Sequence, residues 1–450
     1  MQVNSLQAEA VTLLRDLIRI DTSNPPGGET PAAEYLAEYL TANGVACELV
    51  ARDPSRANVI ARVPGQGGGP SLMLLGHTDV VPAAARGWRH PPFGGVLDDE
   101  GWVWGRGALD MKNEVATRAV AMAEIARTGE PLQGDLVFVA VADEEDGTNR
   151  VGMSWLVDER PDLATDYVIN EGAAERLQLA DGRTVVTVCV GEKSAATVRV
   201  TALGVPGHAS MPGGEPRAVP ALAELIRRLA AYQPRRRLLP ATEVMLERLF
   251  GSAPNGDIDV AIRRATGLHP AFAQIIGPLF STTIAPTRLH GSPALNVLPD
   301  RASVDCDCRL LPGTTTEELY DELAEALGSD VPYELELLDA PVGGTISPIE
   351  SPLFDAIAAL LAEHDPGVIL LPTLSVGFTD SHYARATFRS QAYGLWPSRS
   401  SPFEVYSTVH GHDERVHRDD IGYATVFHIE LCRALLGRGD PSGPGGQPSA

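Results

Sequence analysis

The chain has few of the features that mark secreted, membrane-spanning or nucleic-acid-binding proteins. Its 450 residues include only five cysteines, an odd number, most of them in apolar or strand-like surroundings. A disulfide framework is therefore not indicated, and we expect a reducing, cytoplasmic compartment. No run approaches the roughly 18 apolar residues of a membrane span, and the N-terminal leucines follow helical spacing instead of forming a signal peptide. The chain has 36 basic and 59 acidic residues. Because its net charge is therefore strongly negative, we expect no nucleic-acid or anionic-membrane partner.

The pattern of short apolar runs predicts two kinds of domain. Residues 45–190 alternate strand-like runs such as "SLMLLG" and "DLVFVAVA" with helical ones, which favours an α/β domain with a mixed, largely parallel sheet. After residue 192 alternating strands and two helices predict a smaller α+β domain with an antiparallel sheet. The expected boundaries are 1–191 and 341–437 for the first domain, 192–340 for the second, and 438–450 for a disordered tail. Residues 233–290 read as an insertion or a helical excursion within the second domain.

The stretch "VADEEDG" follows one of the apolar runs and holds four consecutive carboxylates. Glu144 and Glu145 can serve one site only where the strand ends and bends, because neighbouring side chains on a strand point to opposite faces. A solvated acidic turn is the alternative. For Asp143 and Asp146 a solvated or turn-forming role is the default expectation.

Other polar residues with metal-binding chemistry also follow strand-like runs or lie in loops. His77 and Asp79 lie in "GHTDVV", where the carboxylate can orient the imidazole for a metal or simply cap a loop. Asp110 precedes a helix and could be an ordinary N-cap. Glu171 ends "DYVINEG", and His410 and His412 lie in "STVHGHDERV", where exposed surface residues are the plain alternative. Cys306 and Cys308 read as alternation on one strand, because no second cysteine pair completes a metal site.

Taken together, these residues indicate a catalytic metal centre. Imidazole and carboxylate ligands without cysteine suit catalytic zinc better than structural zinc. The candidate ligands exceed one tetrahedral site but suit two ions that share a carboxylate, an arrangement used in hydrolysis.

The order and context of these motifs, from "GHTDVV" to "HGHDE", resemble the dizinc aminoacylase/carboxypeptidase family over nearly the whole chain. That family includes succinyl-diaminopimelate desuccinylase, acetylornithine deacetylase, aminoacylase and glutamate carboxypeptidase. The resemblance implies a catalytic α/β domain interrupted by a lid domain that also dimerises. It implies two zinc ions, with cobalt or manganese as possible substitutes, and hydrolysis of an amide bond in a peptide or N-acyl amino acid.

The resemblance also implies roles for individual residues. His77 and Glu171 would complete one zinc site, Glu145 and His410 the other, and Asp110, followed by a cis peptide bond, would bridge the two. Asp79 would hold His77, and Glu144 would act as the general base. His412 is the alternative to His410.

In the second domain, "TALGVPGHASMP" resembles the family's lid motif, in which His208 would reach the partner subunit's site in a homodimer and stabilise the oxyanion. Asn296 of "PALNVLPD" would contact substrate. Arg309 is either a ligand for a substrate carboxylate or an arginine on an exposed strand.

The chain departs from the family pattern in "GFTDSHYAR", where His382 occupies the position of a substrate-binding arginine and Arg385 follows three residues later. Recognition of a substrate carboxylate by His382, by Arg309 or by both therefore stays open. Two rival functions are a lidless dizinc aminopeptidase, disfavoured by residues 192–340, and a non-catalytic metal- or peptide-binding relative, disfavoured by the presence of Glu144.

Overall fold

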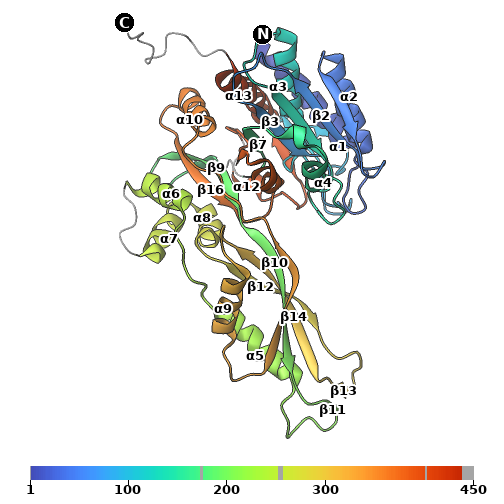
Figure 1. Cartoon of the computed structure of the whole chain (residues 1–450), viewed down its shortest axis with the longest axis vertical. Coiled ribbons are helices and arrows are strands. Elements are labelled where there is room, and N and C mark those ends of the chain that lie inside the picture. The colour runs from blue at the N-terminus through green and yellow to red at the C-terminus, as the bar shows by residue number, and fades with distance from the viewer. Residues whose placement is uncertain (1, 173–175, 252–256, 401–402, 438–450) are drawn as a thin grey trace. The chain divides into compact units, whose positions relative to one another are not determined.

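A computed structural model describes residues 2–172, 176–251, 257–400 and 403–437. The chain forms two compact units (Figure 1). The first comprises Met1–Val190, Ser347–Pro372 and Thr379–Ala450, and the second comprises Gly191–Ile346 and Thr373–Phe378. The segment 438–450, expected to be a disordered tail, lies outside the described residues.

The first unit is built on a mixed sheet with the order β1-β2-β6-β3-β7-β17-β9-β16, to which β8 is added beside β9. Its four central strands, β6, β3, β7 and β17, run parallel to one another. The strands are β1 (Ala46–Val50), β2 (Asn58–Val63), β3 (Leu72–His77), β6 (Leu136–Val141), β7 (Tyr167–Asn170), β8 (Arg176–Gln178), β9 (Thr184–Glu192), β16 (Ile369–Ser375) and β17 (Gln391–Gly394). Every residue of β3, β6 and β7 is buried, as expected for parallel strands covered on both faces.

Helices cover both faces of this sheet (Figure 1). Three of them pack against one another: α1 (Gln2–Arg19), α3 (Lys112–Thr128) and α13 (Arg418–Leu436). Gly76 lets α3 approach β3 closely, since a Cβ there would lie 2.9 Å from Val115. The cluster of Met73, Leu75 and the alternate valines of β6 packs instead against Met153 and Leu156 of α4 (Met153–Glu159). The remaining helices are α2 (Thr30–Ala42), α10 (Pro352–His364), α11 (Ser381–Tyr383) and α12 (Phe403–Tyr406).

The second unit is an antiparallel sheet, β12-β14-β10-β15, whose core is shared with two helices. Its elements are β10 (Ser194–Leu203), β12 (Thr283–His290), β14 (Arg301–Leu310), β15 (Tyr333–Val342), α5 (Ala218–Ala231) and α9 (Thr316–Leu327). Cys306 and Cys308 are both buried in this core, on alternate positions of β14. A short pair, β11 (Gly207–His208) and β13 (Val297–Leu298), lies outside the main sheet.

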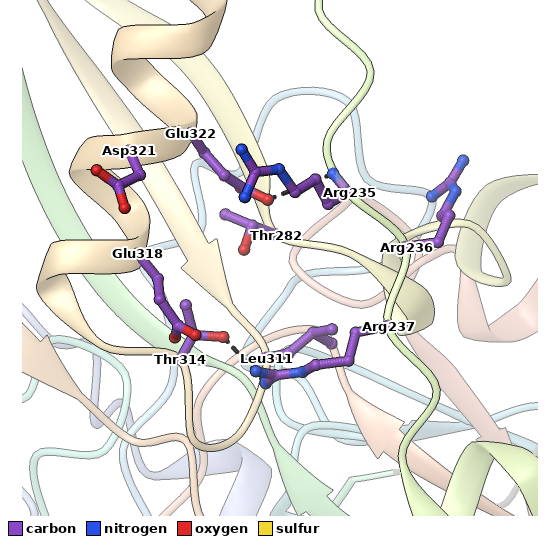
Figure 2. Close-up of a pocket in the computed structure, with 9 residues that line it drawn as sticks. All are labelled: Arg235, Arg236, Arg237, Thr282, Leu311, Thr314, Glu318, Asp321 and Glu322. Atoms are coloured by element: carbon purple, nitrogen blue, oxygen red, sulfur yellow. Dashed lines mark hydrogen bonds between the residues drawn. The ribbon is translucent and has the colours of Figure 1, made fainter.

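The described part of residues 233–290 contains three helices, α6 (Pro240–Phe250), α7 (Ile258–Thr266) and α8 (Pro270–Ile275), followed by β12. Figure 2 shows Arg235, Arg236 and Arg237 at the start of this segment, where they line a pocket together with Glu318, Asp321 and Glu322 of α9. Arg235 pairs with Glu325 at 2.5 Å, and Arg236 pairs with Asp259 at 3.1 Å. Arg237 donates to Thr314 Oγ1 at 3.0 Å, so each of the three arginines has a partner within the second unit.

The second unit ends later in the sequence than the pattern of strands suggests. We expect the second domain to end at residue 340, whereas the second unit continues to Ile346 and also includes Thr373–Phe378, which falls within the segment 341–437 expected for the first domain. The reason is that the chain after β15 pairs with the chain before β10: Gly191 bridges Ile346, and the Thr345 hydroxyl donates to Glu192 at 2.5 Å. Among the described residues, no helix is both long enough and apolar enough to cross a membrane.

Candidate metal centre

Three parallel strands bring candidate ligands to one edge of the sheet. His77 is the last residue of β3, and its backbone is in register with Val141, the last residue of β6. Glu144 and Glu145 follow β6, and Glu171 follows β7. Because parallel strands end at the same edge, residues distant in sequence lie close together there.

Asp110 lies between the two candidate histidines. It lies two residues before α3, whose N-cap is Met111 and not Asp110, and the peptide bond between Asp110 and Met111 is cis. One carboxylate oxygen of Asp110 lies 3.1 Å from His77 Nε2, and the other lies 3.1 Å from His410 Nε2. The carboxylate therefore joins the two imidazoles, one through each oxygen.

The remaining carboxylates flank this pair. Glu171 lies 3.5 Å from His77 Nε2, and Glu145 lies 3.1 Å from His410 Nε2. Glu144 approaches His77 Nε2 at 4.0 Å. Ligand atoms of His77, Asp110 and Glu145, and separately of His77, Glu144 and Glu171, all lie within 4.8 Å of one another.

These spacings fit metal ligation. Zinc ligands at about 2.0–2.2 Å in a tetrahedral arrangement lie roughly 3.4 Å from one another. The distances from the two histidines to Asp110, Glu171 and Glu145 are 3.1–3.5 Å. Glu145 also has a buried carboxylate oxygen without a hydrogen-bond partner among the described residues. A polar atom of this kind is costly to bury unless a cation or donor satisfies it.

Asp79 contacts His77 through both its backbone and its side chain. The closer contact of His77 Nδ1 is the backbone carbonyl of Asp79 at 2.9 Å, with the carboxylate at 3.5 Å. A carbonyl can only accept, so Nδ1 carries the proton and leaves Nε2 free for a metal in the neutral ring. The Asp79 carboxylate also accepts from the backbone N–H groups of Glu144 and Glu145, at 3.2 and 3.1 Å.

Crowding of buried carboxylates shifts several pKa values. Burial raises the pKa of Glu144 well above its usual value, and the charge of Glu171 raises it further. Hydrogen bonds to Asp110 and Glu145 raise the pKa of His410 to about 10. Burial opposes protonation of His77, but Glu171, Asp110 and Asp79 outweigh it, so its pKa also lies above the ordinary value. Without metal, the cluster therefore retains protons that a metal ion would displace.

Of the two histidines in "VHGHDE", the structure brings His410 to the cluster. His410 has a backbone φ of +59°. His412 packs edge-on against Trp88, with ring centres 6.2 Å apart.

Two acidic residues at the site were not singled out from the sequence. Glu414 is fully buried and accepts from the backbone N–H groups of Leu109 and Asp110, at 2.7 and 3.1 Å, while pairing with Arg106 at 2.5 Å. Asp380 is buried, and the charges of His77 and Glu171 influence its pKa, which burial raises well above the usual value. Both lie in the quoted motifs "HGHDE" and "GFTDSHYAR", but only three-dimensional proximity distinguishes them from other acidic residues.

Of the two roles expected for Asp143, solvated or turn-forming, the structure shows the turn-forming one. Its side chain is buried and forms an ion pair with Arg56 at 3.2 Å, while its φ of +64° gives the turn that follows β6. Asp146 is exposed and bonded to Thr148. The four carboxylates of "VADEEDG" therefore have different environments.

The candidate substrate-binding residues of the second unit form separate local contacts. Pairing of β11 with β13 brings His208 beside Asn296, whose carbonyl accepts from Ala209 at 3.0 Å. Arg309 is bonded to Asp307, two residues earlier on β14, at 2.7 Å. These contacts leave the substrate roles of His208, Asn296 and Arg309 as proposals.

Two further residues of "GFTDSHYAR" belong to the first unit. His382 is half-buried, with its ring beside Tyr383. Arg385 is buried and donates to Ser347 Oγ at 2.9 Å and to the carbonyl of Ala392 at 2.6 Å. Arg385 is therefore engaged in fixing β17.

The parallel sheet, the separate antiparallel unit and the histidine–carboxylate cluster define the class of the protein as a metallohydrolase. Residues 73–434 match the peptidase family M20/M25/M40, and the chain belongs to this family of metallopeptidases and amidohydrolases. It is 27% identical over 433 residues to aminoacylase-1 of Mus musculus, covering 95% of each protein. It is 28% identical over 433 residues to succinyl-diaminopimelate desuccinylase of Cereibacter sphaeroides, covering 94% of this chain and 98% of that protein.

The fold is similar to that of an M20 family metallo-carboxypeptidase from Sulfolobus solfataricus. The TM-score is 0.71 at 20% sequence identity, over 95% of this chain and 99% of that one. The family membership and the antiparallel unit together argue against a lidless, single-domain aminopeptidase.

Proposed function

We propose that the protein hydrolyses the amide bond of an N-acyl amino acid or a small peptide, using a two-metal centre. The observation that carries the proposal is the Asp110 carboxylate, which lies 3.1 Å from both His77 and His410. His77 and Glu171 would hold one ion, His410 and Glu145 the other, and Asp110 both. Two zinc ions there would lower the pKa of a bound water and polarise the substrate carbonyl, as cobalt or manganese also can.

Glu144 is the proposed general base. Its carboxylate lies beside the cluster, and the backbone N–H of Glu144 is held by Asp79 at 3.2 Å. In the metal-free protein, burial and the charge of Glu171 raise the pKa of Glu144. Glu144 would take a proton from the attacking water and pass it to the leaving amine. A non-catalytic relative would not need a base at this position.

The second unit is proposed to complete the site in a homodimer. His208 Nδ1 accepts from the backbone N–H of Ser210 at 3.2 Å, so the neutral ring carries its proton on Nε2. That N–H would donate to the developing oxyanion in the partner subunit's site. Asn296, His382 and Arg309 are the proposed substrate contacts, and the five free cysteines suit a cytoplasmic enzyme.

A substrate panel tests the proposed reaction. Purified protein supplied with zinc, cobalt or manganese is assayed by amine release from N-acetyl and N-succinyl amino acids and from dipeptides. We expect hydrolysis of at least one of these classes. Failure on every class with two ions bound would contradict the proposal.

The protonation of the cluster predicts that metal binding releases protons. His410 has a pKa of about 10 without metal, so its imidazole is protonated at pH 8 and must lose a proton to bind zinc. We expect release of at least about one proton at pH 8 and tighter apparent zinc binding as the pH rises from about 7 to 9. Calorimetry in buffers of different ionisation enthalpy measures both. His410→Ala should reduce the release, whereas His412→Ala, altering the residue beside Trp88, should not.

Replacing His208 tests the role of the second unit. We expect His208→Ala to lower kcat about 10²–10³-fold, because one oxyanion donor is lost, with metal content and oligomeric state unchanged. His290→Ala provides a matched control, since His290 lies in the same unit and is bonded to Asp305 at 2.8 Å. If His208→Ala were as active as His290→Ala and the unmodified protein, His208 would not have the role assigned to it.

A further inference from the structure

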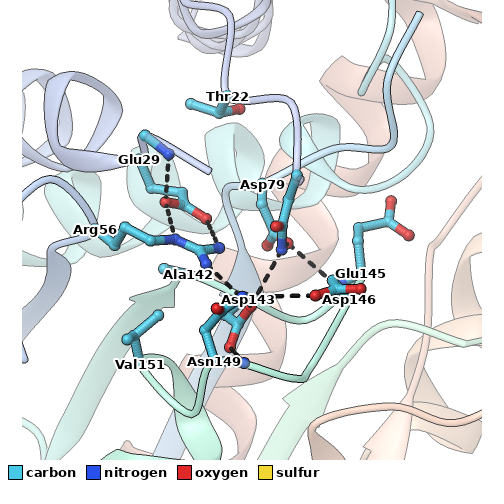
Figure 3. A network of polar contacts seen from close by, with 12 residues as sticks. Thr22, Glu29, Arg56, Asp79, Ala142, Asp143, Glu145, Asp146, Asn149 and Val151 are labelled. Carbon is cyan, nitrogen blue, oxygen red and sulfur yellow. Dashed lines mark hydrogen bonds and ion pairs between the residues drawn. The ribbon is translucent and has the colours of Figure 1, made fainter. Parts of the chain in front are cut away.

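A buried ionic network lies beneath the turn that carries Glu144 and Glu145 (Figure 3). Its centre is Arg56, located just before β2, with 3% of its surface exposed. The guanidinium donates to both oxygens of Glu29, at 2.8 and 2.5 Å. Its remaining terminal nitrogen lies 3.2 Å from Asp143. One cation is thus shared by two buried carboxylates.

Asp143 connects this network to both ends of the turn. One carboxylate oxygen accepts from the backbone N–H of Asn149 at 3.0 Å, and the carbonyl of Asp143 accepts from Gly147 at 3.1 Å. Figure 3 shows Asp143 between Arg56 and Asn149. Glu145 and Asp146 lie on the stretch of chain that joins Asp143 to Asn149. Fixing Asp143 therefore fixes where the chain leaves β6 and enters the turn.

A second path leads from Asp143 to the same glutamates. The amide nitrogen of Asn24 donates to Asp143 at 3.2 Å and to Asp79 at 2.9 Å. The Asp79 carboxylate in turn accepts from the backbone N–H groups of Glu144 and Glu145. Both backbone groups thus depend on a carboxylate that is linked through Asn24 to the network around Arg56.

We propose that Arg56 is a positioning residue, which holds the Glu144–Glu145 turn in its working geometry through Asp143. The proposal rests on the proposed function of the site. Without Arg56, Glu29 and Asp143 would be buried charges without their cation, which is strongly unfavourable. The turn can relieve this by moving Asp143 toward water, and that movement displaces Glu144 and Glu145 with it.

The strand pair β2–β6 contains a matched control at its other end. Arg62 near the end of β2 pairs with Asp135, just before β6, at 2.9 Å, whereas Arg56 and Asp143 lie at the end facing the site. Both ion pairs join the same two strands. The Arg62–Asp135 pair is about one-third exposed and the Arg56–Asp143 pair is buried, so Arg56→Met should cost more stability than Arg62→Met. Positioning of the turn predicts, in addition, a loss of kcat and of metal retention in folded Arg56→Met that Arg62→Met does not show.

The test compares Arg56→Met, Arg56→Lys and Arg62→Met with the unmodified protein at saturating metal. We expect Arg56→Met to lower kcat about 10–100-fold and to weaken retention of one metal ion by a similar factor, as found for residues that orient metal ligands. KM should change by less than about twofold, because substrate contacts are untouched. Arg56→Lys should recover part of both losses, and Arg62→Met should resemble the unmodified protein. Circular dichroism and thermal unfolding establish that each variant is folded at the assay temperature.

The results for these variants distinguish failure of the positioning role from failure of the proposed function. Unchanged kcat and metal retention in folded Arg56→Met, or equal losses in Arg62→Met, would overturn the positioning role while leaving the proposed hydrolase intact. If the unmodified protein hydrolyses no panel substrate, the proposed function fails, and cobalt binding followed by its visible absorption still tests the geometry at Glu145. If Arg56→Met does not fold, Asp143→Asn replaces it, and a wild-type kcat and cobalt spectrum in that variant would equally overturn the proposal.

Discussion

Replacing Glu144 with alanine is expected to lower kcat about 10²–10⁴-fold, the usual contribution of a general base. The carboxylate lies 4.0 Å from His77 Nε2, outside the closer pairs formed with Asp110 and Glu171. Its loss should therefore leave most of the metal affinity in place. The measurement is kcat on the best panel substrate, with zinc content determined on the same samples.

The turn itself provides the control for this prediction. Asp146 is exposed, is two residues away and is bonded to Thr148. Asp146→Ala removes the same kind of charge from the same turn and should keep kcat within about twofold. Equal activity of Glu144→Ala and the unmodified protein would eliminate the assigned base, and loss of zinc from Glu144→Ala would indicate a ligand instead.

Replacing Asp110 with alanine should affect both metal ions together. Each of its oxygens lies 3.1 Å from a different histidine, so the change removes a ligand from both proposed sites. We expect metal affinity at both sites to fall by more than the roughly 10–100-fold typical of residues that only orient ligands, and turnover to be lost at micromolar zinc. Stepwise cobalt or zinc titration with calorimetric or optical detection measures the two affinities separately.

Variants on either side of Asp110 show whether it is shared. Glu171→Ala, on the His77 side, should weaken one ion, and Glu145→Ala, on the His410 side, should weaken the other. Weakening of only one ion by Asp110→Ala would contradict the shared ligand, even if activity were lost.

Most of the candidate centre follows from local sequence patterns. The apolar runs "SLMLLG", "DLVFVAVA" and "DYVIN" are long enough and clean enough to identify three buried strands, and the structure confirms the α/β fold with its separate antiparallel unit. Because parallel strands end at the same edge of a sheet, the proximity of ligands at their ends can be predicted without further information about the fold. This reasoning predicts the positions of four residues of the centre: His77, Glu144, Glu145 and Glu171.

The remainder depends on contacts between distant segments. The burial of Asp143 requires Arg56, which is 87 positions earlier and stands in an unremarkable loop before β2. An acidic residue in an acidic turn gives no local sign of such a partner. In the same way, "HGHDE" does not show that Glu414 binds the backbone before α3, which is 304 residues away. Pairing partners of buried charges are properties of the folded chain and are not encoded in local periodicity.

Metal titration of the metal-free protein, followed by hydrolysis of the panel substrates, shows whether hydrolysis depends on two bound metal ions. We expect the metal-free protein to be inactive, and we expect activity to return with zinc or cobalt and to reach its maximum at two ions per chain. Full activity in the metal-free protein, or no hydrolysis of any N-acyl amino acid or dipeptide with two ions bound, would contradict this expectation.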